Sequence, residues 1–140
     1  MAAVSITWVE KKIFVGVDST QHSVVISSAE DGVGCKPSEL LLMALGSCSA
    51  YDVVGILEKK RVALHSVKVQ VTGEQDTELP RQFRRIHVHY QISGVDVRDE
   101  DVRRAIELSE EKYCSVAATL RHGAELTFDY EIAQENPVVS

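Results

Sequence analysis

One segment of the 140-residue chain limits its possible folds more than any other, the run that begins at Pro37. Proline suits the first position of a helix, and the basic residues Lys59, Lys60 and Arg61 suit its last turn. A helix that is apolar on nearly every side must be covered by other elements. We therefore expect a buried central helix, and a homodimer, because so short a chain has little material left to cover it. The apolar residues of this helix are Leu40, Leu41, Leu42, Met43, Ala44, Leu45, Tyr51, Val53, Val54, Ile56 and Leu57.

The same helix does not read as a membrane span, because Gly46, Ser47, Ser49 and Asp52 interrupt its apolar run. The N-terminal residues also lack the basic and then apolar pattern of a signal peptide. We expect a soluble cytoplasmic protein that has no membrane partner. The net charge of −6 and the scattering of the 15 Lys and Arg residues argue against a nucleic-acid partner.

Strands are predicted on both sides of the helix. Before it, Ile13–Val17 and Ser23–Ile26 are rich in β-branched residues. After it, His65–Thr72 and Arg84–Ser93 alternate between polar and apolar residues, and a last alternating strand runs from Leu126 to Ile132. This alternation is typical of half-buried antiparallel strands.

A second helix is predicted from Asp99, because Val102, Ala105 and Ile106 recur at helical spacing. A short helical piece, Ser115–Leu120, follows Cys114. The chain therefore belongs to the α+β class, with antiparallel strands around a long buried central helix. No linker separates two parts of the sequence, so we expect a single domain over residues 1–140.

The cysteines Cys35, Cys48 and Cys114 are the residues most suited to chemistry. Without an export signal we expect reduced thiols, which serve as core residues, metal ligands or redox groups. Cys48 lies near the middle of the long helix, where the small side chains of Gly46–Ala50 allow a close approach, although a thiol there can simply pack as a small hydrophobe. Cys114 begins a helical segment, where thiolate is favoured, so it is expected to be the more acidic thiol. Cys35, in a predicted exposed loop, is expected to be incidental.

The histidines give a weaker signal. His87 and His89 share one face of a predicted strand, and this spacing could begin a metal site. The same face carries Arg85 and Gln91, so a solvated polar face is the favoured interpretation and no metal or other cofactor is predicted.

Two motifs around the cysteines resemble the signatures of the OsmC/Ohr family. The first comprises Pro37–Leu42 and Ala44–Cys48, followed by Asp52 and Val53. The second comprises Ala105–Ser109 and Lys112–Val116. The order of the predicted elements also resembles this family over nearly the whole chain.

The resemblance implies an OsmC-like fold and an intertwined homodimer with each active site at the subunit interface. It implies reduction of organic hydroperoxides, in defence against oxidative stress. Cys48 would be the peroxidatic thiolate and Cys114 the resolving thiol, and an external dithiol would reopen their disulfide. No metal is needed for this chemistry.

The sequence departs from the family's hydroperoxidases at two positions. They carry an Arg in the N-terminal strands that stabilises the thiolate, but this chain has no Arg before Arg61. They also carry a Glu directly after the proline of the first signature, where this chain has Ser38. These departures keep a second hypothesis open: a non-catalytic ligand-binding or redox-sensing module on the same dimer. A hotdog-type thioester hydrolase is a third alternative, but it lacks a suitably placed carboxylate and leaves the two cysteine motifs unexplained.

Overall fold

The structure is a computed structural model that describes residues 1–137. Its contacts divide the chain into two compact units, Met1–Leu41 and Leu42–Ser140. The expectation of a single domain therefore stays a prediction, and each unit is described by itself below.

The first unit contains a three-stranded antiparallel sheet in the order β1-β2-β3. Its strands are Ser5–Glu10, Ile13–Val17 and Ser23–Ser27, and the last two confirm the predicted strands. The turn between β2 and β3 is held by Asp18, whose Oδ1 accepts hydrogen bonds from the amides of Thr20 at 2.9 Å and His22 at 3.0 Å. The sequence did not reveal β1, because every residue of this strand is exposed and no buried face marks its period.

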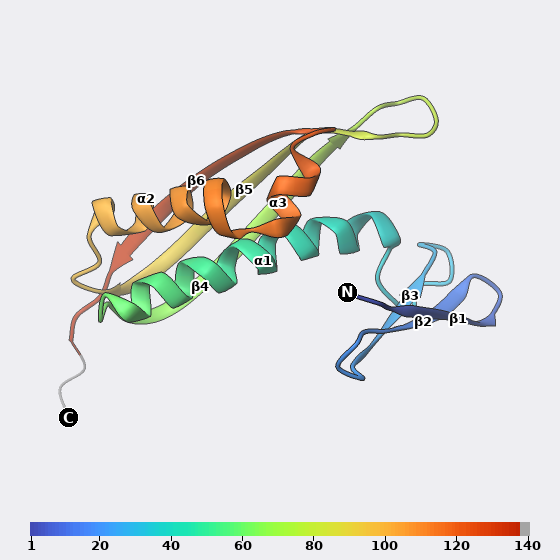
Figure 1. Cartoon of the computed structure of the whole chain (residues 1–140), viewed down its shortest axis with the longest axis horizontal. Helices are drawn as coiled ribbons and strands as arrows, with labels where there is room; N and C mark the ends of the chain where they lie inside the picture. The colour runs from blue at the N-terminus through green and yellow to red at the C-terminus, as the bar shows by residue number, and fades with distance from the viewer. Residues whose placement is uncertain (138–140) are drawn as a thin grey trace. The chain divides into compact units, whose positions relative to one another are not determined.

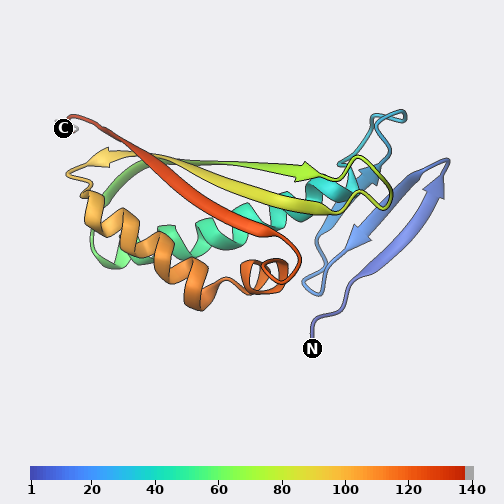
Figure 2. The same ribbon diagram turned by 90° about the horizontal axis from the view of Figure 1, so that it is seen from above.

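The second unit is a three-stranded sheet with helices on one face (Figures 1 and 2). The strands β4 (Ala63–Gln75) and β5 (Phe83–Val95) form the predicted antiparallel pair. The helical elements are α1 (Pro37–Lys59), which starts in the first unit, then α2 (Asp99–Leu108), a π-helical turn η1 (Ser109–Tyr113) and α3 (Ser115–Leu120). The last strand is β6 (Glu125–Gln134). The α+β class with a long central helix is confirmed.

The strand β6 departs from the antiparallel expectation, since it pairs with β5 in parallel. The connection between the two strands runs through α2, η1 and α3 on the helical face of the sheet (Figure 2). A crossover of this kind returns the chain to the end of the sheet at which β5 begins, so the next strand must run in the same direction as β5. Sequence alternation gives the faces of a strand but not its direction.

The core of the second unit lies between the sheet and the helices. Its central residues include Leu45, Val53 and Leu57 from α1. Val88 and Tyr90 of β5 pack in the same core, and all five residues are fully buried. At Gly46 the helix approaches the sheet so closely that an added Cβ atom would lie 2.8 Å from a methyl carbon of Val71. The small residue is therefore required by the contact between α1 and β4.

Within the described residues, the second unit covers α1 on one side only, as expected for a chain too short to surround this helix. The sheet and α2 bury one face, whereas Met43 and Tyr51 on the opposite side are 52% and 82% exposed. A single sheet with helices on one face has no further layer to cover the second side of α1.

The polarity of α1 is also lower than expected. An 18-residue window of this 23-residue helix has a mean hydropathy of 1.8, so by length and composition alone the helix could cross a bilayer. The core helix of a soluble protein meets the same test, and 28% of this window is buried within the described residues, with Leu45, Val53 and Leu57 among its buried residues.

Candidate thiol site

The second unit brings Cys48 and Cys114 together. Cys48 lies on α1 and is half-buried, whereas Cys114 lies between η1 and α3 and is only 3% exposed. The Cys48 side chain lies close enough to Cys114 to raise the pKa of that thiol. Two positions far apart in the sequence thus meet where the first helix crosses the start of α3.

The backbone around Cys114 explains how this thiol is positioned. Its amide donates a 2.8 Å hydrogen bond to the carbonyl oxygen of Ser109, which closes the π-helical turn. Cys114 then takes an extended conformation and acts as the N-cap of α3, where its Sγ accepts a 3.4 Å hydrogen bond from the amide of Ala117. The predicted helix start at Cys114 is confirmed. π-Helical turns are rare and often occur at functional sites.

The expected acidity of Cys114 is wrong. Burial above all, and then the neighbouring Cys48 side chain, raise the pKa of its thiol to about 11. The amide of Ala117 favours the thiolate, as a helix start should, but its effect is smaller than that of burial. The sequence shows that a thiol begins a helix, whereas the loss of hydration depends on how the helix is packed.

A buried polar network continues from the thiols into the core. The hydroxyls of Ser49 and Tyr90 share a short hydrogen bond, and burial, above all, raises the pKa of the Tyr90 phenol. Cys48, Cys114 and Asp52 raise that pKa further, so the phenol lies within electrostatic range of both thiols. It stays protonated at neutral pH.

The hydroxyl of Ser109 links the π-helical turn to α1 by donating a 2.8 Å hydrogen bond to Oδ2 of Asp52. The sequence does not reveal the roles of Ser49, Tyr90 and Ser109, because the alternation of β5 presents Tyr90 as an apolar core residue. The useful signal is the spacing of Cys48, Ser49 and Asp52, which places these polar groups on neighbouring positions of one buried helix.

The remaining cysteine, Cys35, belongs to the first unit. Its amide donates a 2.9 Å hydrogen bond to the carbonyl oxygen of Val25, and its own carbonyl oxygen accepts one from Ser27 at 3.1 Å. These bonds dock the loop on β3, so Cys35 is half-buried and not exposed as expected.

Comparisons with known proteins agree with this architecture. The family model described as OsmC-like protein matches residues 29–129. Protein YhfA of Escherichia coli K12 is 39% identical over 127 residues, which cover 91% of this chain and 95% of that protein. This chain therefore belongs to the OsmC-like family, and its similarity to YhfA places it near that subgroup.

Two solved structures show the breadth of the similarity. A hypothetical protein from Aquifex aeolicus has a TM-score of 0.88 at 29% identity, with 97% of this chain and 98% of that chain covered. The organic hydroperoxide resistance protein OhrB of Bacillus subtilis has a TM-score of 0.61 at 14% identity, with 94% and 98% covered. The second similarity shows a shared fold alone. Together these findings confirm the OsmC-like fold and leave no support for a hotdog-type hydrolase.

Proposed function

We propose that the protein reduces organic hydroperoxides, with Cys48 as the peroxidatic thiol and Cys114 as the resolving thiol. The observation that carries this proposal is the proximity of two free thiols of unequal burial, one of which raises the pKa of the other. Cys48 is half-buried and can meet a small substrate, whereas Cys114 is buried and stays a neutral thiol at pH 7 because its pKa is about 11. The unequal burial favours Cys48 as the attacking group.

The reaction proceeds in three balanced steps. The Cys48 thiolate attacks one oxygen of the peroxide, the O–O bond breaks, and the alkoxide takes a proton to leave as the alcohol, so Cys48 becomes a sulfenic acid. The thiol of Cys114 then condenses with the sulfenic acid to form a disulfide and release water. An external dithiol reduces that disulfide by thiol exchange and is itself oxidised. These steps need reduced thiols at rest, which fits the proposed cytoplasmic location.

A homodimer forms part of this proposal. The exposed side of α1 carries Met43 and Tyr51, and a hollow of about 650 Å³ lies along it between Tyr51, Gly55 and Tyr113. Covering this face with a second copy would bury the apolar surface that one chain leaves open. Obligate interfaces of this kind bury on the order of 2,000 Å² or more. Tyr113 directly precedes Cys114, so the same contact would border the thiol site.

The second candidate function is a redox-sensing or ligand-binding module without turnover. It is favoured by the absence of any Arg before Arg61 and by Ser38 at the position where the family's hydroperoxidases carry Glu. Within the residues that the structure describes, the groups that shift the pKa of Cys114 are Cys48 and the amides of Ala117 and Val116, and none of them is a cation. A thiol without a positive neighbour gains little help in ionising.

One experiment separates the two candidates. Reduced protein is mixed with an organic hydroperoxide or with hydrogen peroxide in a stopped-flow instrument, and thiol loss is followed over time. The proposal expects rapid loss of two thiols per chain with the organic peroxide, and peptide mapping should identify a Cys48–Cys114 disulfide. Cys48→Ser should abolish the fast phase, Cys114→Ser should stop the reaction at a sulfenic acid, and the matched control Cys35→Ser should behave like the parent.

Two outcomes would contradict the peroxidase. If both thiols remain alkylatable after treatment with peroxide, the binding module replaces it. If one disulfide forms but an excess of dithiol and peroxide gives no repeated turnover, the redox sensor replaces it.

A further inference from the structure

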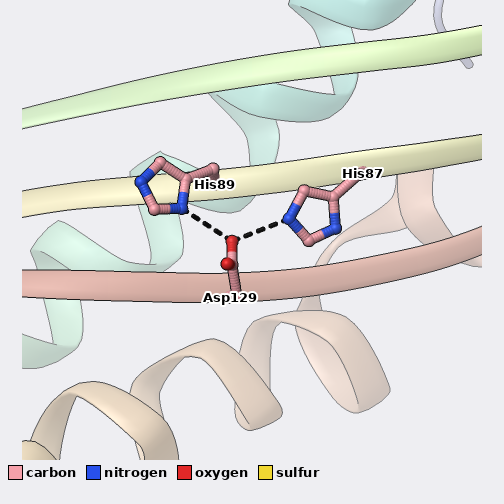
Figure 3. A group of neighbouring side chains, drawn as sticks. All are labelled: His87, His89 and Asp129. Atoms are coloured by element: carbon pink, nitrogen blue, oxygen red, sulfur yellow. Dashed lines mark hydrogen bonds and ion pairs between the residues drawn. The ribbon is translucent and has the colours of Figure 1, made fainter.

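The outward face of the second sheet carries a group of side chains that the thiol chemistry does not use. Val88 and Tyr90 of β5 point into the core, so His87 and His89 point away from it. The parallel partner β6 places Asp129 directly beside His89 in the register. Figure 3 shows the two imidazole rings on either side of this carboxylate.

The three side chains converge on one point. Oδ1 of Asp129 lies 2.7 Å from Nε2 of His87 and 2.7 Å from Nδ1 of His89. One nitrogen from each ring and one carboxylate oxygen lie within 4.8 Å of one another. Neighbouring donors around a tetrahedral Zn²⁺ ion stand about 3.4 Å apart, given bonds of about 2.1 Å. Movements of about 1 Å or less in the partly exposed rings would therefore place all three donors around one ion.

The other nitrogen of each ring also has a neighbour. Nδ1 of His87 lies 2.6 Å from the hydroxyl of Thr127, and Nε2 of His89 lies 3.6 Å from Oε2 of Glu131. Histidines that bind metals usually donate their second N–H to such a group, which fixes the ring orientation and the tautomer. Here both rings are oriented so that their remaining nitrogens face the shared Asp129 oxygen.

We propose that His87, His89 and Asp129 form a binding site for a divalent transition-metal ion of the Zn²⁺ and Cu²⁺ class. Two imidazoles and one carboxylate suit these ions, whereas Mg²⁺ and Ca²⁺ prefer sites made of oxygen donors. The side chains of His87, His89 and Asp129 are 40%, 25% and 56% exposed, so water completes the coordination. Thr127 and Glu131 act as positioning residues that hold the rings. The site is independent of the proposed peroxide chemistry, since it lies on the opposite face of β5 from Tyr90.

The test is a calorimetric titration of the metal-free, reduced full chain with Zn²⁺. We expect one ion per chain, with the dissociation constant raised more than about tenfold by His87→Gln, His89→Gln or Asp129→Asn. Thr127→Val should raise it by about tenfold, as the loss of an outer partner typically does. His122→Gln is the matched control because it removes an imidazole outside the group, and it should leave the dissociation constant unchanged. Mg²⁺ should produce no saturable binding.

The thiols could also bind Zn²⁺, so the titration is repeated with the Cys48→Ser/Cys114→Ser variant. Retained binding in this variant assigns the ion to the sheet face. The proposal is overturned if this variant loses the binding, if His87→Gln and His89→Gln bind Zn²⁺ as the parent does, or if equilibrium dialysis finds no ion retained by the parent chain.

Discussion

Both faces of α1 carry apolar residues, but the two faces have different surroundings in the structure. The inner face buries Leu45, Val53 and Leu57 under the sheet, whereas the outer face leaves Met43 and Tyr51 open. Cys48 lies between them and is half-buried. An apolar helix can therefore be covered by its own chain on one side only, and Cys48 lies at the boundary between its covered and open sides. Three predictions test this division.

The largest effect is expected on the inner face. Leu45→Ala removes a fully buried side chain and leaves a cavity, so the free energy of unfolding should fall by about 2–5 kcal/mol. Met43→Ala on the outer face should change it by less than about 0.5 kcal/mol in the monomer. Urea denaturation at low protein concentration measures both values. Equal losses would show that the outer face is also packed within a single chain.

A somewhat smaller effect is expected for the association of two chains through the outer face. Tyr51 is 82% exposed on one chain, and a tyrosine at the centre of an interface often contributes about 2 kcal/mol or more. Tyr51→Glu should therefore raise the dimer dissociation constant by at least about 30-fold, as measured by analytical ultracentrifugation. The matched control Gln70→Glu adds the same charge at an exposed position of β4. A parent chain that is monomeric at micromolar concentration, or a Tyr51→Glu dimer as tight as the parent, would contradict this prediction.

Periodicity predicted most elements of the second unit. The alternation of Val67, Val69 and Val71 marked β4, and the stripe from Val102 to Ile106 marked α2, because in both cases one buried face imposes a period on the sequence. The strand β1 lacks such a face in this structure and was missed. The parallel direction of β6 was also not predicted, because direction depends on the crossover path.

The candidate sites also have features that the sequence could not predict, because these features depend on tertiary packing. Both thiols were predicted as a pair from the resemblance of their motifs, and Cys48 lies close enough to Cys114 to raise its pKa. The participation of Asp129 beside His87 and His89 could not be predicted, since it depends on the register between β5 and β6. The acidity of Cys114 was predicted wrongly because burial, a property of the packed chain, outweighs the local backbone. A sequence pattern indicates which residue types recur, but hydration and register come from tertiary packing.

The smallest effect concerns the pKa of Cys114. It tests whether burial and the neighbouring Cys48 on α1 raise this pKa. Burial is the first cause that raises this pKa to about 11, and the neighbouring Cys48 side chain is the second. Since a raised thiol pKa means that the neutral form persists to higher pH, alkylation of Cys114 should be slow at pH 7 and should rise towards a midpoint near pH 11. In Cys48→Ser the thiol partner is lost while burial remains, so the midpoint should fall but stay above the ordinary value of 9.0. The rate of iodoacetamide labelling at Cys114, followed by mass spectrometry across this pH range, measures both midpoints, with Cys35→Ser as the control. A midpoint below 9.0 in the parent would show that the helix start outweighs burial, and Cys114 would then compete with Cys48 for the attacking role.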